Sequence, residues 1–352
     1  MIELLLYYLF CNFIDKDYYM LYSRQDLKDL KNQDVQIAFD CYMHKYNKGE
    51  LKKLKAHERD FLFFRMSLFH SNKECKGQSD FDLRKIEEAK EYLFYRIILI
   101  YAKDIIDFSS IPIGYKGKLT ADENRKNQRF FYEYMHIWKN QVNSRKGEYL
   151  SQISKALNRK LNDWKELLNK NQIKKERYKQ KITFIWAVFF HIYYRTKLYF
   201  DEKSCKYEEV LVNGYKVRFD IYSFIHIMSR HYYPDMNDDI GISLNSSIPG
   251  IDLYELPTSI LDLIKAYFQY TELTEATEFL LLAVNKEKYI LWIKHCTLNG
   301  TSREIGFQVR SFYKCKEQRD LDKFIDKIEI IYLENYSFFI PQTPLNTTQQ
   351  KR

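Results

Sequence analysis

Two histidines and an arginine fall within one short segment of this sequence, residues 221–234, which reads IYSFIHIMSRHYYP. The apolar spacing of the segment is typical of a helix, and His226 and Arg230, four residues apart, share one face of it. His231 lies about 100° further round the same helix. An imidazole exchanges protons near neutral pH, and an arginine stabilises an anionic transition state. The segment therefore predicts acid–base chemistry on a phosphodiester.

The elements on either side of this helix are the ones that must position it. Before it, Asn213-Gly214 separates two β-prone runs within residues 208–219, which is a strong signal for a hairpin. After it, we expect a helix at Ile260–Tyr270 and then strands. The three β-like runs are Phe279–Val284, Tyr289–Cys296 and Ile305–Lys314.

This order of a hairpin, a helix ending in Arg-His, a connecting helix and three strands resembles the phage-associated branch of the barnase, EndoU, colicin and RelE-like ribonucleases. The resemblance covers roughly residues 205–335. It implies a toxin or phage-defence endoribonuclease that works without a metal or other cofactor. In such enzymes a base takes the proton of a ribose 2′-OH and an acid protonates the leaving 5′-oxygen. It also implies RNA as the substrate and an inhibitor or antitoxin protein as a partner.

The resemblance also assigns residues to the catalytic site. His231 and Arg230 match the Arg-His end of the family's helix, and His226 matches its earlier histidine. Arg310 or Ser311 matches the polar position on the last strand. The family commonly has a glycine soon after the Arg-His, whereas Tyr-Tyr-Pro follows it in this chain.

For a base carried by a strand, the candidate from alternation is Lys294, which shares one strand face with residues 288, 290 and 292. Simpler roles fit the same residues. Histidines in an aromatic helix often only hydrogen-bond a backbone carbonyl. Regular alternation puts Ser311 on a face with Ile305, Phe307 and Val309, which favours a buried hydroxyl.

A basic region precedes this part of the chain. Residues 139–181 contain 13 lysines and arginines against four acidic residues, with tryptophan and tyrosine between them, and the apolar period of residues 150–168 predicts an amphipathic helix. This pattern indicates a surface for a polyanion, although a solvated face of long helices fits as well. The candidate nucleic-acid-binding residues are Lys155, Arg159, Lys160, Lys174, Lys175 and Arg177.

The net charge differs between two parts of the 352-residue chain: it is +13 in residues 1–200 and −4 in the remainder. We expect an α+β protein in which a large all-α N-terminal domain (1–200) precedes a small α+β domain with an antiparallel sheet (201–340) and a disordered tail (341–352). Within this frame we expect further helices and a last strand. These expected segments are a helix at Leu83–Ile106, a helix that opens at Thr120, a helix at Leu321–Ile328 and a strand at Glu329–Phe339.

Several classes of protein are disfavoured. The six cysteines form no CxxC pair, which disfavours a zinc site and favours a reducing cytosol. The apolar run at residues 182–200 is interrupted by His191 and Arg195, which favours a core helix over a membrane span. The opening residues lack the features of a signal peptide. The oligomeric state stays open.

Two alternatives to the resemblance remain. The first is a non-enzymatic helical scaffold that binds nucleic acid or protein. The second depends on Arg65 and His70, whose spacing is similar to the signature of the all-helical HEPN ribonucleases.

Overall fold

The structure is a computed structural model that describes residues 32–71, 82–101, 106, 108, 121–231, 255–298 and 304–342. The chain forms two compact units, of which the first comprises Met1–Arg96 and Ile111–Phe130 and the second Ile97–Ser110 and Phe131–Arg352. Helices make up the described chain as far as residue 202, and a seven-stranded mixed sheet follows within the described residues. The predicted α+β class is therefore confirmed.

The first unit is helical. Its helix α3 packs on α4, and aromatic side chains such as Tyr42 and Phe61 meet edge to face between them, with ring centroids 5.9 Å apart. The predicted helix at Leu83–Ile106 differs, because Ile86 takes an extended backbone and two 3-10 turns precede the α-helix. The elements that begin in this unit are α3 (Asn32–Asn47), η1 (Leu51–Lys53), α4 (Ala56–Ser71), η2 (Leu83–Lys85), η3 (Glu87–Ala89), α5 (Lys90–Tyr101) and α6 (Ala121–Ser144).

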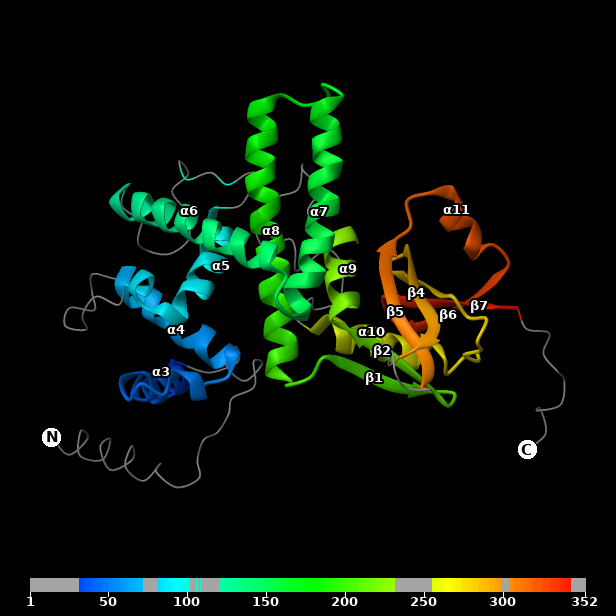
Figure 1. The fold of residues 1–352 in the computed structure, drawn as a ribbon. Coiled ribbons are helices and arrows are strands. Elements are labelled where there is room, and N and C mark those ends of the chain that lie inside the picture. Colours follow the sequence, from blue (N-terminus) through cyan, green and yellow to red (C-terminus); the bar gives the residue numbers. More distant parts are fainter. Residues whose placement is uncertain are drawn as a thin grey trace. The chain divides into compact units, whose positions relative to one another are not determined.

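In the second unit, α7 (Gly147–Asn169) and α8 (Lys175–Glu202) form an antiparallel hairpin (Figure 1). The helix α7 is amphipathic, as its sequence predicts, and buries one apolar stripe that includes Leu157 and Trp164. The helix α8 is buried around most of its circumference between Phe184 and Phe200, as expected for a core helix. Within the described residues, no helix is long and apolar enough to cross a membrane.

The sheet has the strand order β1-β2-β5-β4-β3-β7-β6. Every neighbouring pair is antiparallel except β2 and β5, so the sheet is mixed and the prediction of an antiparallel sheet needs this correction. The strands are β1 (Tyr207–Val212), β2 (Tyr215–Asp220), β3 (Phe279–Val284), β4 (Glu287–Thr297), β5 (Ile305–Lys314), β6 (Lys327–Leu333) and β7 (Tyr336–Pro341).

Local sequence signals identified most of these strands. Asn213 and Gly214 both have positive φ angles, of 47° and 84°, which is the backbone that a two-residue hairpin turn requires, and the predicted hairpin is confirmed. The three strand predictions from residue 279 to residue 314 are also confirmed.

Two predictions near the C-terminus are wrong. The expected helix at Leu321–Ile328 is limited to α11 (Gln318–Leu321) and the 3-10 turn η6 (Asp322–Phe324), and β6 begins at Lys327. The expected strand at Glu329–Phe339 is two strands, because the chain turns between β6 and β7 and the two pair with each other. The predicted tail and the opening residues 1–31 lie outside the described residues, apart from residues 341 and 342.

Two helices cover one face of the sheet. The helix α9 (Ile221–His231) contacts β2 and β5, and α10 (Leu256–Tyr267) contacts β1 and β2. On α9, Phe224 meets the rings of Phe219 from the sheet and Phe200 from α8. The sequence boundary near residue 200 thus falls inside one compact unit, because α7 and α8 pack against α9.

Candidate functional site

The position of α9 is fixed at its N-terminus by Asp220, the last residue of β2. This carboxylate caps the helix by accepting a 2.8 Å hydrogen bond from the backbone N–H of Ser223. Its other oxygen accepts a hydrogen bond from the side-chain amide of Gln308 on β5. The hydroxyl of Ser223 lies 2.6 Å from the carbonyl oxygen of Val309 and 2.9 Å from Asp220 Oδ1. These contacts fasten the start of α9 to β2 and β5.

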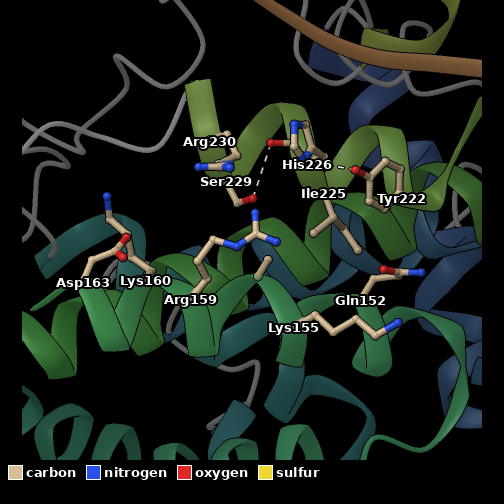
Figure 2. A pocket seen from close by; sticks show the side chains of 11 residues that line it. Gln152, Lys155, Arg159, Lys160, Asp163, Tyr222, Ile225, His226, Ser229 and Arg230 are labelled. Carbon is tan, nitrogen blue, oxygen red and sulfur yellow. Dashed lines mark hydrogen bonds between the residues drawn. The ribbon is translucent and has the colours of Figure 1, made fainter. Parts of the chain in front are cut away.

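A small pocket lies between α7 and α9, and we call it the α7–α9 pocket (Figure 2). Its volume is about 170 Å³. The described residues of its walls lie on these two helices, which are in contact within the second unit. The lining residues are Gln152, Lys155, Ala156, Arg159, Lys160 and Asp163 on α7 and Tyr222, Ile225, His226, Ser229 and Arg230 on α9.

The described lining is strongly cationic, since lysine and arginine supply four of its side chains and Asp163 supplies its single carboxylate. Figure 2 shows the guanidinium of Arg159 reaching from α7 toward α9. Within the described part of the chain, neither Arg159 nor Arg230 takes part in a salt bridge, and both side chains are exposed. An anion that enters the pocket therefore meets guanidinium groups from both helices.

His226 forms part of the α9 wall. Its ring stacks on that of Tyr222, one turn earlier, with centroids 5.4 Å apart and an angle of 28° between the planes. The Tyr222 hydroxyl lies 3.4 Å from His226 Nδ1, and Figure 2 marks this hydrogen bond. Burial, and then the charges of Arg230, Arg159 and Arg310, together lower the pKa of His226 to about 4. His226 is therefore neutral at physiological pH.

The side chain of Arg310 contacts the ring of Tyr222. Its guanidinium carbon lies 5.2 Å from the centre of the Tyr222 ring, which is a cation–π contact. In β5, Ser311 pairs with Trp292 and Val309 pairs with Ile293, so Arg310 is the extra residue of a β-bulge. Arg310, Tyr222 and His226 thus form a column from the sheet to the pocket.

Lys294 and Ser311 do not join this cluster. Ser311 is directly opposite Trp292 in the register of β4 and β5, so both project from the same face of the sheet, and alternation puts Lys294 on that face as well. This face packs against η6, whereas α9 packs on the other face through Phe219. The expectation that Ser311 shares a face with Phe307 and Val309 is wrong, because the bulge at residue 310 reverses the alternation.

The remaining predicted residues lie elsewhere. His231 ends α9, and its side chain lies outside the described residues. Lys174 and Lys175 are exposed where α8 begins, and Arg177 is half-buried in its first turn, all outside the pocket lining. Arg65 is half-buried in α4, but the side chain of His70 lies outside the described residues.

The sequence reasoning missed Tyr222 and Ser229 as residues of the site. The spacing of Tyr222, four residues before His226, was the available signal, since residues at i and i+4 are neighbours on a helix. Among the residues that the structure describes, no group of three or more His, Cys, Asp or Glu side chains is placed to hold a metal ion. No protein-family model, curated protein or solved structure matches this chain.

Proposed function

We propose that this protein binds RNA and that the α7–α9 pocket receives a phosphate of the RNA backbone. The observation that carries the proposal is the convergence of residues from two separate sequence regions. The basic helix contributes Lys155, Arg159 and Lys160, and the histidine-containing helix contributes His226 and Arg230 to the same pocket.

The size and charge of the pocket favour a phosphate group over a whole cofactor. Pockets that enclose a drug-sized ligand measure roughly 300–1,000 Å³, whereas this one measures about 170 Å³. It has room for a phosphate with part of its sugar. Guanidinium groups match the geometry of phosphate oxygens and bind them with two parallel hydrogen bonds.

The surroundings favour a polymer over a single small anion. The exposed Lys174 and Lys175 lie beyond the far end of α7, so they offer additional cations at a distance from the pocket. A chain of phosphates can contact both places at once. Each phosphate contact releases roughly 0.7 to 0.9 counterion, so such binding depends steeply on salt concentration.

The experiment that tests this proposal measures RNA affinity by fluorescence anisotropy over a range of salt concentrations. The variant Arg159→Gln/Arg230→Gln removes the two pocket guanidinium groups, and we expect binding to weaken by about tenfold or more. The salt slope should also fall by about one for each RNA phosphate that the variant no longer binds. The control is Lys165→Gln, which removes an exposed cation of α7 that does not line the pocket.

Equal affinities for wild type, the double variant and the control would refute phosphate binding in the pocket. If the full chain binds neither RNA nor DNA at low salt, the non-enzymatic protein-binding scaffold replaces this proposal. Preference for RNA over DNA of the same sequence would indicate recognition of the ribose 2′-OH.

A second candidate function, metal-independent cleavage of RNA, is favoured by the neutral state of His226 beside the arginines. In this reaction neutral His226 accepts the proton of a ribose 2′-OH, and the oxygen attacks the adjacent phosphorus. The bond to the 5′-oxygen breaks, which leaves a 2′,3′-cyclic phosphate and a 5′-hydroxyl. Arg159 and Arg230 would stabilise the charge on the phosphorane. His231, the second proton-transfer group of the predicted pair, would give the proton to the leaving oxygen.

Cleavage is tested with purified chain, defined RNA and EDTA. His226→Ala should reduce the rate by roughly 10²- to 10⁴-fold if His226 is the base, while the melting temperature reports whether the variant is folded. Undiminished cleavage by the folded variant would remove His226 from the mechanism. An active enzyme of this kind would act in the cytoplasm as a toxin or in phage defence, and an inhibitor or antitoxin protein would have to cover the pocket.

A further inference from the structure

We propose that Arg310 is a positioning residue that acts through Tyr222 to fix the orientation of the His226 ring in the α7–α9 pocket. Arg310 is not among the residues that line the pocket. Its effect on an RNA phosphate is therefore indirect. The inference rests on the proposed function, because the orientation of His226 affects RNA only if the pocket binds RNA.

A β-bulge directs the side chain of Arg310. In a regular strand, Arg310 would be opposite a residue of β4, and its side chain would follow the alternation of its neighbours. The register skips Arg310 instead, since Val309 and Ser311 pair with consecutive residues of β4. Bulges bend a strand and re-aim a side chain. Here the re-aimed side chain lies over the ring of Tyr222.

Arg310, Tyr222 and His226 form a column of stacked groups. The Arg310 guanidinium covers the Tyr222 ring, and that ring stacks on His226. The Tyr222 hydroxyl also meets His226 Nδ1 at 3.4 Å. A ring held by a stack and by one hydrogen bond has few orientations. Within the described residues, the Nε atom of Arg310 is buried and has no hydrogen-bond partner. The guanidinium makes the cation–π contact with Tyr222.

The charge of Arg310 also acts on His226. Among the described residues, the charged and titratable groups near His226 come from three elements. Arg310 lies on β5, and its charge contributes to the low pKa of His226. The others line the pocket, namely Tyr222 and Arg230 on α9 and Lys155, Arg159, Lys160 and Asp163 on α7. The loss of Arg310 therefore removes a charge from the sheet side while the pocket cations remain.

The experiment is an NMR titration of the His226 ring in the full chain without RNA. In Arg310→Gln we expect the pKa of His226 to move upward from about 4, toward its ordinary value. In Arg310→Lys, which keeps the charge, the pKa should stay close to that of wild type. The control is Lys316→Gln, an exposed site beyond the end of β5 and about 20 Å along an extended chain from Arg310.

A second variant keeps the inference testable if Arg310→Gln does not fold. Tyr222→Phe retains the ring and removes the hydroxyl, so the ¹⁵N shifts of His226 should report a changed tautomer balance. An unchanged titration in folded Arg310→Gln, or unchanged ¹⁵N shifts in Tyr222→Phe, would overturn the inference. Neither result depends on RNA, so failure of the proposed function would appear separately, in the affinity of Arg159→Gln/Arg230→Gln.

Discussion

His226 illustrates how surroundings change the chemistry that a residue type suggests. From sequence, two histidines near their ordinary pKa of about 6.5 predict activity that is bell-shaped between roughly pH 5 and 8. In the structure, burial and three nearby arginines lower the pKa of His226 to about 4. His226 is therefore already in the neutral form that a base requires at neutral pH, and it carries no imidazolium proton to donate there.

This shift predicts the pH dependence of RNA cleavage. A base acts when it is deprotonated, and a lowered pKa keeps it deprotonated to lower pH. We expect the rate to stay level as pH falls from 7 to about 5 and then to drop as pH passes through about 4. Initial rates in buffers of constant ionic strength measure this profile. An acid limb near pH 6.5 would assign the base to another group.

Stability should depend on pH through His191, a buried residue of α8. Burial, and then the charge of Arg195, lowers the pKa of His191 to about 3. This folded-state pKa lies below the unfolded value of about 6.5. Above about pH 6.5, His191 is therefore neutral in both states and does not lower the free energy of unfolding. As pH falls from there toward 3, the unfolded chain takes up a proton that the folded chain does not, and the free energy of unfolding falls. One such group contributes a slope of at most about 1.4 kcal/mol per pH unit.

Urea unfolding between pH 7 and 4.5 tests this linkage. We expect the free energy of unfolding of wild type to decline with pH more steeply than that of His191→Phe, which has no imidazole to protonate. The comparison uses the slopes and not the absolute stabilities, because the substitution also changes packing. Parallel slopes in the two proteins would show that His191 does not carry the effect.

At the scale of the element, α9 depends on the cap at its N-terminus. Asp220 accepts hydrogen bonds from the backbone of Ser223 and from the side chain of Gln308. Loss of an N-cap side chain costs about 1 kcal/mol. We expect Asp220→Ala to lose at least that much stability in urea unfolding, and Asp220→Asn to lose less because an amide oxygen still caps the helix.

Loss of the Asp220 cap should also affect the pocket, since α9 forms one of its walls. RNA affinity of Asp220→Ala, measured under conditions where the variant is folded, should fall relative to Asp220→Asn. If the two variants were equal in both stability and affinity, the cap would not be what positions α9.

At the scale of the whole molecule, the pocket needs residues from both sides of the charge boundary near residue 200. The change from net positive to net negative charge near residue 200 separates α7 and α8 from α9. The compact unit keeps all three together, and Phe200 on α8 meets Phe224 on α9. Separating the chain at the boundary that the charge suggests, near residue 200, would expose these aromatic rings and remove one wall of the pocket.

A fragment of residues 1–200 tests this point. From sequence alone it should retain RNA affinity because it carries the positive charge. From the structure we expect it to bind RNA more weakly than the full chain and with a smaller salt slope, since Arg230 and the α9 wall are missing. Equal affinity and slope for fragment and full chain would place RNA binding on surfaces outside the pocket.

The sequence by itself determined the features that depend on near neighbours along the chain. The apolar period of residues 150–168 predicted α7, and Asn213-Gly214 predicted the hairpin, since helix spacing and left-handed turn residues are local properties. The positions of His226 and Arg230 on one helical face followed in the same way.

Only the tertiary structure decided which of these features meet. The pairing of β5 with β2 and the bulge at Arg310 arise from strands far apart in sequence, and the bulge moved Ser311 to the opposite sheet face from that expected. The contact of α7 with α9 brought Arg159 to His226 across more than sixty residues. Such contacts depend on which apolar faces bury each other, and periodicity within a segment shows that a face exists without showing what covers it.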